Sequence, residues 1–183
     1  MFFQWVLTHC EISGPDENEK TQFKKILKTQ IMTLNKIAWS FSDEKYTSQE
    51  EFNKEVTQCQ IDIFKNDDKW KPEEICFELA EINICYEAWV KGPEDLMENE
   101  TLIDDDKDAF EEEPDEDDGY YQVEINANLK ADNGKNFSAL EFLFKAHNTQ
   151  ANKDLGDHVF FEGTDEKPEI IDGKAYCYIA CGS

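Results

Sequence analysis

The chain has 183 residues and a formal net charge of −24, from 42 acidic and 18 basic side chains. Such a surface repels nucleic acid and anionic membranes, because both are dense arrays of negative charge. All 18 basic residues are lysine, and arginine is absent. Because arginine is the side chain that binds phosphate through two parallel hydrogen bonds, its absence argues against a kinase or another nucleotide-binding enzyme.

The length and composition fit one folded domain spanning residues 1–183, and the order of the elements described below predicts that it is of the α+β class. Hydrophobic residues make up 39% and aromatic residues 13%, which is enough to bury a core. The six cysteines form no CxxC pair and lie mostly in apolar stretches, as free buried thiols do, so we expect neither a zinc site nor a disulfide framework. The apolar start, residues 1–10, has no basic flank. We therefore expect no signal peptide and no membrane span, and a cytoplasmic location.

The first elements expected along the chain are a strand, a helix and a second strand. Residues 2–12 are rich in aromatic and branched side chains and end at a Ser-Gly-Pro turn, which predicts a strand. Residues 16–31 open with a pattern resembling a capping box and continue with apolar side chains at helical spacing, which predicts a helix. In residues 34–41, apolar and small side chains alternate, and this pattern favours a strand.

A second helix is predicted after a capping box formed by Thr47 and Glu50. Its apolar stripe has intervals of four, three and four residues. The stripe consists of Phe52, Val56, Cys59 and Ile63. Residues 73–90 allow either a single helix or a strand in the second half, and the alternation of side chains from Ile82 to Val90 favours the strand.

An acidic loop is expected at residues 94–119, because residues 94–118 hold fifteen acidic residues and one lysine. Closely spaced carboxylates can imitate the phosphates of a nucleic acid and attract a basic protein, with Tyr120 and Tyr121 as packed anchors beside them. The same composition also fits a solvated loop without a partner. The candidate partner-binding residues are Asp104, Asp105, Asp106, Asp108, Glu111, Glu112, Glu113, Asp115, Glu116, Asp117, Asp118, Tyr120 and Tyr121.

A calcium-binding EF-hand loop does not fit the acidic run in either register. Aligned from Asp104, such a loop would have Ala109 at its required glycine position. Aligned from Asp115, it would end at Asn126 in place of the bidentate glutamate. Loose binding of cations stays open.

The second half of the chain gives clearer patterns. Residues 123–130 alternate apolar and polar side chains, as in a strand with one solvent-exposed face. Ser138 and Glu141 form a third capping box, and the helix after it is expected to bury Leu140, Phe144 and His147. Apolar residues 159–161 and a last strand at 175–181 follow. Strands and helices do not alternate regularly as βαβ units along the chain. The elements therefore predict a mixed, mostly antiparallel sheet packed by about three helices.

Catalytic motifs are absent from the sequence: it has no HExxH, no GxSxG and no glycine-rich phosphate loop. We therefore expect a protein that is not an enzyme and uses no cofactor. An alternative metal site would use Asp154, Asp157, His158 and Glu162. A structural role suffices to explain the same turn, with Asp154 capping it, Gly156 in a left-handed conformation and His158 hydrogen-bonded at the start of the next strand.

The last third of the chain resembles small acidic bacterial proteins of the toxin-immunity kind. The resemblance lies in residues 137–143, the helix ending near His147-Asn148, and the stretch DLGDHVFFEG at 154–163. It implies a cytosolic antidote that binds and blocks one cognate toxin, often a basic nuclease, without chemistry of its own. The leading hypothesis is a stoichiometric inhibitor of a basic toxin. The alternatives are a divalent-cation-binding protein and a nucleic-acid mimic that acts on a DNA-binding protein.

Overall fold

The computed structural model describes residues 34–103, 106–114, 119–165 and 167–183, which all belong to one compact unit. The strand predicted at 2–12 and the helix predicted at 16–31 lie outside these ranges. Two α-helices occur within them, fewer than the three expected for the whole chain: α2 (Gln49–Phe64) and α3 (Ala139–Gln150). The strands are β1 (Ile75–Phe77), β2 (Glu81–Val90), β3 (Glu100–Leu102), β4 (Tyr121–Lys130), β5 (Phe137–Ser138), β6 (Phe160–Thr164), β7 (Glu169–Ile171) and β8 (Lys174–Gly182).

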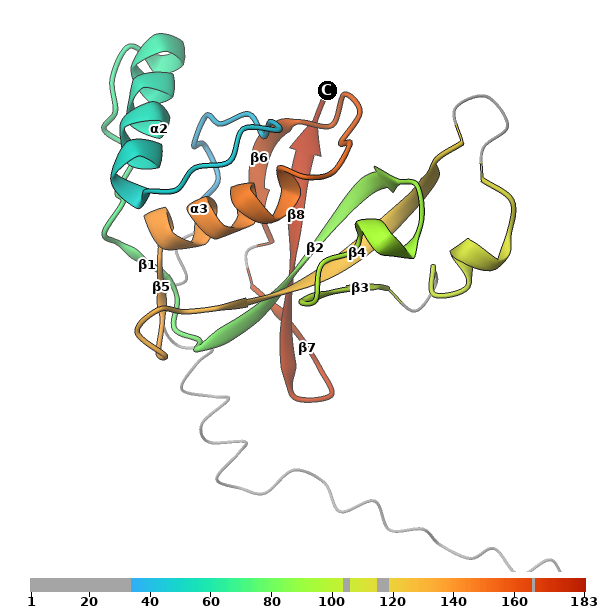
Figure 1. Cartoon of the computed structure of the whole chain (residues 1–183). Helices are drawn as coiled ribbons and strands as arrows, with labels where there is room; N and C mark the ends of the chain where they lie inside the picture. The colour runs from blue at the N-terminus through green and yellow to red at the C-terminus, as the bar shows by residue number, and fades with distance from the viewer. Residues whose placement is uncertain (1–33, 104–105, 115–118, 166) are drawn as a thin grey trace, which may run out of the picture. The chain divides into compact units, whose positions relative to one another are not determined.

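The described residues form a mixed sheet in the order β3-β4-β2-β8-β6, as the α+β prediction requires. β7 pairs with the first part of β8, and β6 with its last part. The pairing of β2 with β8 is parallel, and the other pairings in this sheet are antiparallel. β1 and β5 form a separate two-stranded sheet. α3 lies across one face of the large sheet, and α2 packs beside α3 (Figure 1).

β2 and β4 form the centre of the sheet by pairing in register over ten residues each. The alternation along β4 is confirmed, because Val123, Ile125, Ala127 and Leu129 are buried and the residues between them are less so. Residues 81–90 form a strand, which confirms the preference for a strand in the second half of 73–90. The helical alternative for this stretch is wrong, because pairing with β4 on one side and β8 on the other satisfies the backbone of β2.

Both helices predicted in the described residues are present. Ser138 caps α3 as predicted, since its hydroxyl accepts a hydrogen bond from the Glu141 amide at 3.2 Å. α2 begins one residue later than expected, with Ser48 and not Thr47 as its N-cap. Its predicted stripe is correct at Phe52 and Val56 but wrong at its end, where Ile63 is 59% exposed.

The strand predicted at 34–41 is absent. Lys36 has a φ of 80°, and the chain turns there with a hydrogen bond from the Ile37 amide to the Leu34 carbonyl at 3.2 Å. Only Ser40 forms a β-bridge, with Phe160. The alternation still predicts burial correctly, because Ile37, Trp39 and Phe41 all lie in the core.

The core lies between α3 and the sheet face beneath it. Phe142, Leu143 and Ala146 of α3 are fully buried in the same cluster as Ile84 of β2 and Ile125 of β4. The side chains that alternate with Ile84 and Ile125 point to the opposite face, which we call the outer face. Neither described helix has the length and apolar composition needed to cross a bilayer.

Candidate functional site

The acidic segment, residues 94–119, contains ordered structure at the edge of the sheet. β3 lies within it and pairs with β4, and short 3-10 turns occupy Pro93–Asp95 and Ala109–Glu111. The segment is therefore more than the loop that its composition predicts. Six of the candidate residues lie outside the described part of the chain: Asp104, Asp105, Asp115, Glu116, Asp117 and Asp118.

Side-chain contacts fasten the acidic segment to β4. The Asp106 carboxylate accepts a hydrogen bond from the Glu124 amide at 2.6 Å. Further along, the Phe110 ring packs edge-on against the Tyr121 ring, with centroids 5.2 Å apart. The Tyr121 hydroxyl donates to the Glu112 carbonyl at 3.1 Å. These contacts fix the backbone of the segment on both sides of its second 3-10 turn.

The carboxylates of the second 3-10 turn remain in solvent. The exposed residues here are Asp108, Glu111, Glu112 and Glu113. They follow one another within six positions on a backbone that the Tyr121 and Asp106 contacts hold in place. Their charges therefore lie close together along this backbone, near the beginning of β4.

The two tyrosines predicted as anchors contact their own chain: Tyr121 is the first residue of β4, and Tyr120 directly precedes it. Tyr121 supports the acidic segment through Phe110 and the Glu112 carbonyl. The Lys91 ammonium lies over the Tyr120 ring, 5.3 Å from its centroid. Both side chains are half-buried. Tyr121 is thus already used to position the acids.

One acid of the segment is buried and has a structural role. The Glu100 carboxylate lies 2.8 Å from the Lys153 ammonium, and both side chains are fully buried. It also accepts hydrogen bonds from the Tyr86 hydroxyl at 2.8 Å and from the Met97 amide at 2.7 Å. Burial, together with the Glu100 charge, raises the pKa of Tyr86. This network joins β3 to the loop that follows α3.

The residues of the alternative metal site do not converge. The Asp154 carboxylate accepts a hydrogen bond from the Gly156 amide at 2.9 Å, and Gly156 has a φ of +58°, so Asp154 and Gly156 play the structural roles considered for this turn. His158 Nδ1 lies 3.3 Å from the Glu87 carboxylate, and its Nε2 lies 3.7 Å from Asp157. Glu162 lies against Gly182. Across the described residues, no three His, Cys, Asp or Glu side chains are grouped to hold a metal ion.

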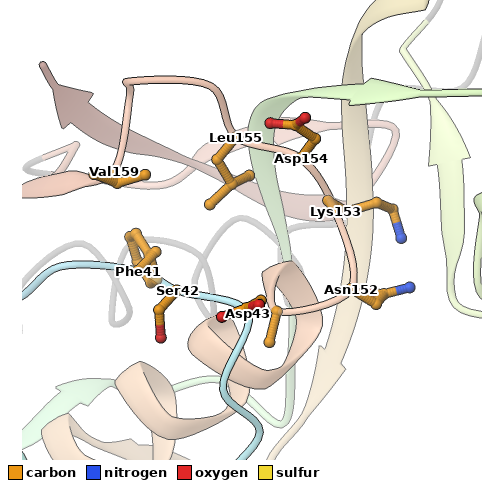
Figure 2. Close-up of a pocket in the computed structure, with 9 residues that line it drawn as sticks. Phe41, Ser42, Asp43, Asn152, Lys153, Asp154, Leu155 and Val159 are labelled. Atoms are coloured by element: carbon orange, nitrogen blue, oxygen red, sulfur yellow. The ribbon is translucent and has the colours of Figure 1, made fainter. Parts of the chain in front are cut away.

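A cavity of about 450 Å³ lies between residues 41–43 and the loop after α3 (Figure 2). Phe41, Leu155 and Val159 form its apolar wall, while the Lys153 ammonium points away from them (Figure 2). That ammonium is paired with Glu100. In the part of the chain that the structure describes, every buried side-chain nitrogen and oxygen has a hydrogen-bond partner. The cavity therefore offers no buried polar group that awaits a ligand.

Three thiols of the described part of the chain are poor nucleophiles. Burial raises the pKa of Cys85 to about 11 and the pKa of Cys177 and of Cys181 to about 12. A thiol with such a pKa stays protonated near neutral pH and reacts slowly.

Comparison with protein-family models, curated proteins and solved structures finds no match for this chain. Two features of the site were not predicted: the buried pair of Glu100 with Lys153, and a groove on the outer face lined by Tyr176 and Tyr178. Both depend on contacts between residues far apart in sequence. Charge and geometry are therefore the basis for inferring the function.

Proposed function

We propose that this protein binds a basic protein partner through its acidic segment and acts as its stoichiometric inhibitor, as an immunity protein neutralises a toxin. One observation carries the proposal: four exposed carboxylates, at Asp108 and Glu111 to Glu113, are presented together on a segment fastened to the sheet edge. Repulsion among them disfavours the compact state, and a cationic partner relieves it.

Electrostatic attraction would control the approach of the partner. The acidic segment carries a charge of −14, and the rest of the chain adds −10. At physiological ionic strength, screening confines the attraction to about 8 Å, so the clustered charges act together on a nearby cationic surface. Such complementarity increases the association rate more than it slows dissociation.

A nuclease is the kind of toxin that this surface suits best. Its substrate groove is cationic because it binds phosphates, and a row of carboxylates can take the place of the phosphates. The resemblance of residues 137–143, of the helix ending near His147-Asn148 and of residues 154–163 to toxin-immunity proteins supports the same inference. A DNA-binding protein would offer a similar groove, so the activity of the captured partner distinguishes these two targets.

The first experiment identifies the partner. The full chain is immobilised, exposed to extract of its native organism, and eluted with increasing salt. We expect a basic protein that elutes with salt, is toxic when expressed alone, and is harmless when this chain is expressed with it. A captured protein that is acidic, or whose toxicity is unchanged by co-expression, would contradict the proposal.

The second experiment locates the interface with two variants of equal charge. One variant neutralises the acidic segment: Asp108→Asn, Glu111→Gln, Glu112→Gln and Glu113→Gln. The control neutralises four exposed acids of α2 and the loop after it: Glu55→Gln, Asp67→Asn, Asp68→Asn and Glu73→Gln.

We expect the segment variant to associate with the captured partner about tenfold more slowly, with a weaker dependence on salt, because the steering charges are gone. The control should remain close to the unmodified protein. Equal slowing in both variants would show that only total charge matters and that the acidic segment is not the site.

A further inference from the structure

The outer face of the sheet carries a row of side chains set by the strand register. Thr101 of β3 lies opposite Asn126 of β4, which lies opposite Cys85 of β2, which lies opposite Tyr178 of β8. These four residues come from strands spread over most of the described chain, yet they cross the sheet in one line. A second row brings Asn128, Asn83 and Tyr176 together in the same way.

Hydrogen bonds hold the floor of these rows in place. The Cys85 thiol donates to the Asn126 side-chain carbonyl at 2.8 Å. The Asn128 amide donates to the Asn83 side-chain carbonyl at 3.2 Å, and the Asn83 amide donates to the Ala175 carbonyl at 3.2 Å. The floor is therefore polar and internally satisfied, so its shape is fixed before anything binds.

A groove of about 370 Å³ lies over this floor. Ile103 and Ile171 supply apolar walls, Tyr176 and Tyr178 supply aromatic rings, and Asp165 and Glu169 supply carboxylates. Among the described residues, none that lines the groove is basic. The Tyr178 side chain is accessible, with 44% of the residue exposed.

The groove is continuous with the acidic segment. Thr101, Leu102 and Ile103 line the groove and belong to that segment. The Asp106 carboxylate accepts from the Glu124 amide, and the Glu124 carboxylate accepts from the Tyr178 hydroxyl at 3.2 Å. Desolvation and the Glu124 charge raise the pKa of Tyr178 to about 12, so its hydroxyl remains a neutral donor. One hydrogen-bonded path thus runs from the acidic segment to the groove.

We infer that this groove receives a lysine or arginine side chain of the basic protein partner, against the rings of Tyr176 and Tyr178 and the carboxylates of Asp165 and Glu169. This inference rests on the proposed function, which supplies a cationic partner. Aromatic faces and carboxylates together favour a cationic side chain. The acidic segment attracts the partner, and the groove provides the packed contact that retains it.

The inference is tested by nuclear magnetic resonance on the full chain, with an oligolysine peptide at low salt as the probe. We expect the backbone and ring signals of Tyr176 and Tyr178 to shift on titration, together with signals of the acidic segment. Glu169→Lys should weaken the groove response about tenfold, because it places a like charge at the site. Glu73→Lys, with the same change in net charge away from the groove, is the control.

A second variant, Tyr178→Leu, removes the ring without changing charge and should give a comparable loss. The spectrum of each variant without peptide shows whether that variant is folded. If Glu169→Lys does not fold, Tyr178→Leu still tests the inference.

The outcomes separate the inference from the proposed function. Shifts confined to the acidic segment overturn the groove inference and leave the proposed function standing. If a captured basic partner binds the segment variant as tightly as the unmodified chain, the proposed function is contradicted. Equal weakening by Glu169→Lys and Glu73→Lys overturns the groove inference, because total charge alone would explain it.

The lysines at 20, 24, 25 and 28 of the chain itself are the competing occupant. If changing all four to glutamine moves the groove signals in the absence of peptide, the groove binds its own chain and the inference is wrong.

Discussion

His147 shows how burial selects one protonation state of a single residue. The residue is completely buried. Trp39 Nε1 donates to its Nδ1 at 3.2 Å, so the proton lies on Nε2, which donates to the Glu44 carbonyl at 2.7 Å. Desolvation lowers its pKa below the ordinary 6.5, although the Glu44 carbonyl opposes that shift. A neutral ring with both nitrogens paired is a structural element of the core.

A pH-dependent loss of stability follows from this lowered pKa. Above pH 6.5 the ring is neutral in both the folded and the unfolded chain, so it causes no penalty. Below pH 6.5 the unfolded chain binds the proton more readily, and stability falls until the pH reaches the lowered pKa. We expect His147→Gln to cost about 1–3 kcal/mol at pH 7 through lost packing. Its stability should fall less between pH 7 and pH 5.5 than that of the unmodified protein.

Denaturant unfolding at several pH values measures this difference. His158→Gln is the matched control, because its side chain is 48% exposed. The prediction is contradicted if His147→Gln and His158→Gln have the same pH dependence.

The buried pair of Glu100 and Lys153 gives a second prediction at the scale of single residues. Lys153→Met leaves the Glu100 charge buried without its partner, which costs about 3–5 kcal/mol. Adding Glu100→Gln removes that charge and should restore part of the loss. Lys54→Met breaks the exposed pair of Lys54 with Glu50 and should leave the urea midpoint nearly unchanged. A double variant no more stable than Lys153→Met would show that the uncompensated charge is not the cause.

At the scale of elements, local patterns predict the long strands and the helices well. β4 alternates because one face is buried, and α3 starts at a serine whose hydroxyl caps it. The end of the α2 stripe is wrong because Gln60 is buried there, where its side chain pairs with both backbone groups of Ala38 at 2.9 and 2.5 Å. Because glutamine is polar, it is not counted in an apolar stripe, and the sequence pattern does not predict that Gln60 is buried. Its burial is seen only from its contact with Ala38 in the folded chain.

The pairing of β6 with β8 depends on a glycine at an irregularity in the register. Gly163 has a φ of +123°, and a Cβ there would lie 3.2 Å from the Cα of Asn35. Gly163→Ala therefore combines backbone strain with a steric clash, and we expect a loss of about 2–4 kcal/mol. Gly134 has a φ of +65° with open space around it. Gly134→Ala should cost only about 1 kcal/mol. Thermal unfolding compares the two, and equal losses would show that the contact with Asn35 yields easily.

At the scale of the whole molecule, the sequence predicts the charge of the site but not its construction. The acidic segment is evident from composition. The anchoring of that segment by Asp106 and Tyr121 is not evident from the sequence. The alternation along β4 predicts which of its side chains are buried, but it does not predict which other segment contacts the strand. The groove is also beyond sequence reasoning, since Cys85 and Tyr178 meet only through the parallel register of β2 and β8.

The net charge of −24 also makes stability depend on salt. At about 0.01 M salt the screening length is about 30 Å, so most carboxylates of the molecule repel one another, whereas at about 0.1 M it is about 10 Å. We expect the midpoint of thermal unfolding to rise with salt. The variant that neutralises Asp108 and Glu111 to Glu113 should unfold about 2–4 °C higher than the unmodified protein at low salt. This gain should shrink as salt is added, because the added ions already screen the charges that the variant removes.

The control with four neutralised acids on α2 and its following loop separates local from global repulsion. If the acidic segment concentrates the repulsion, this control gains less than the segment variant at low salt, although both lose the same charge. A partner that binds the acidic segment would then reduce the largest local source of instability in the free protein, and binding would raise the unfolding midpoint more at low salt than at high salt. Equal gains in the two variants would instead assign the repulsion to the net charge of the whole molecule.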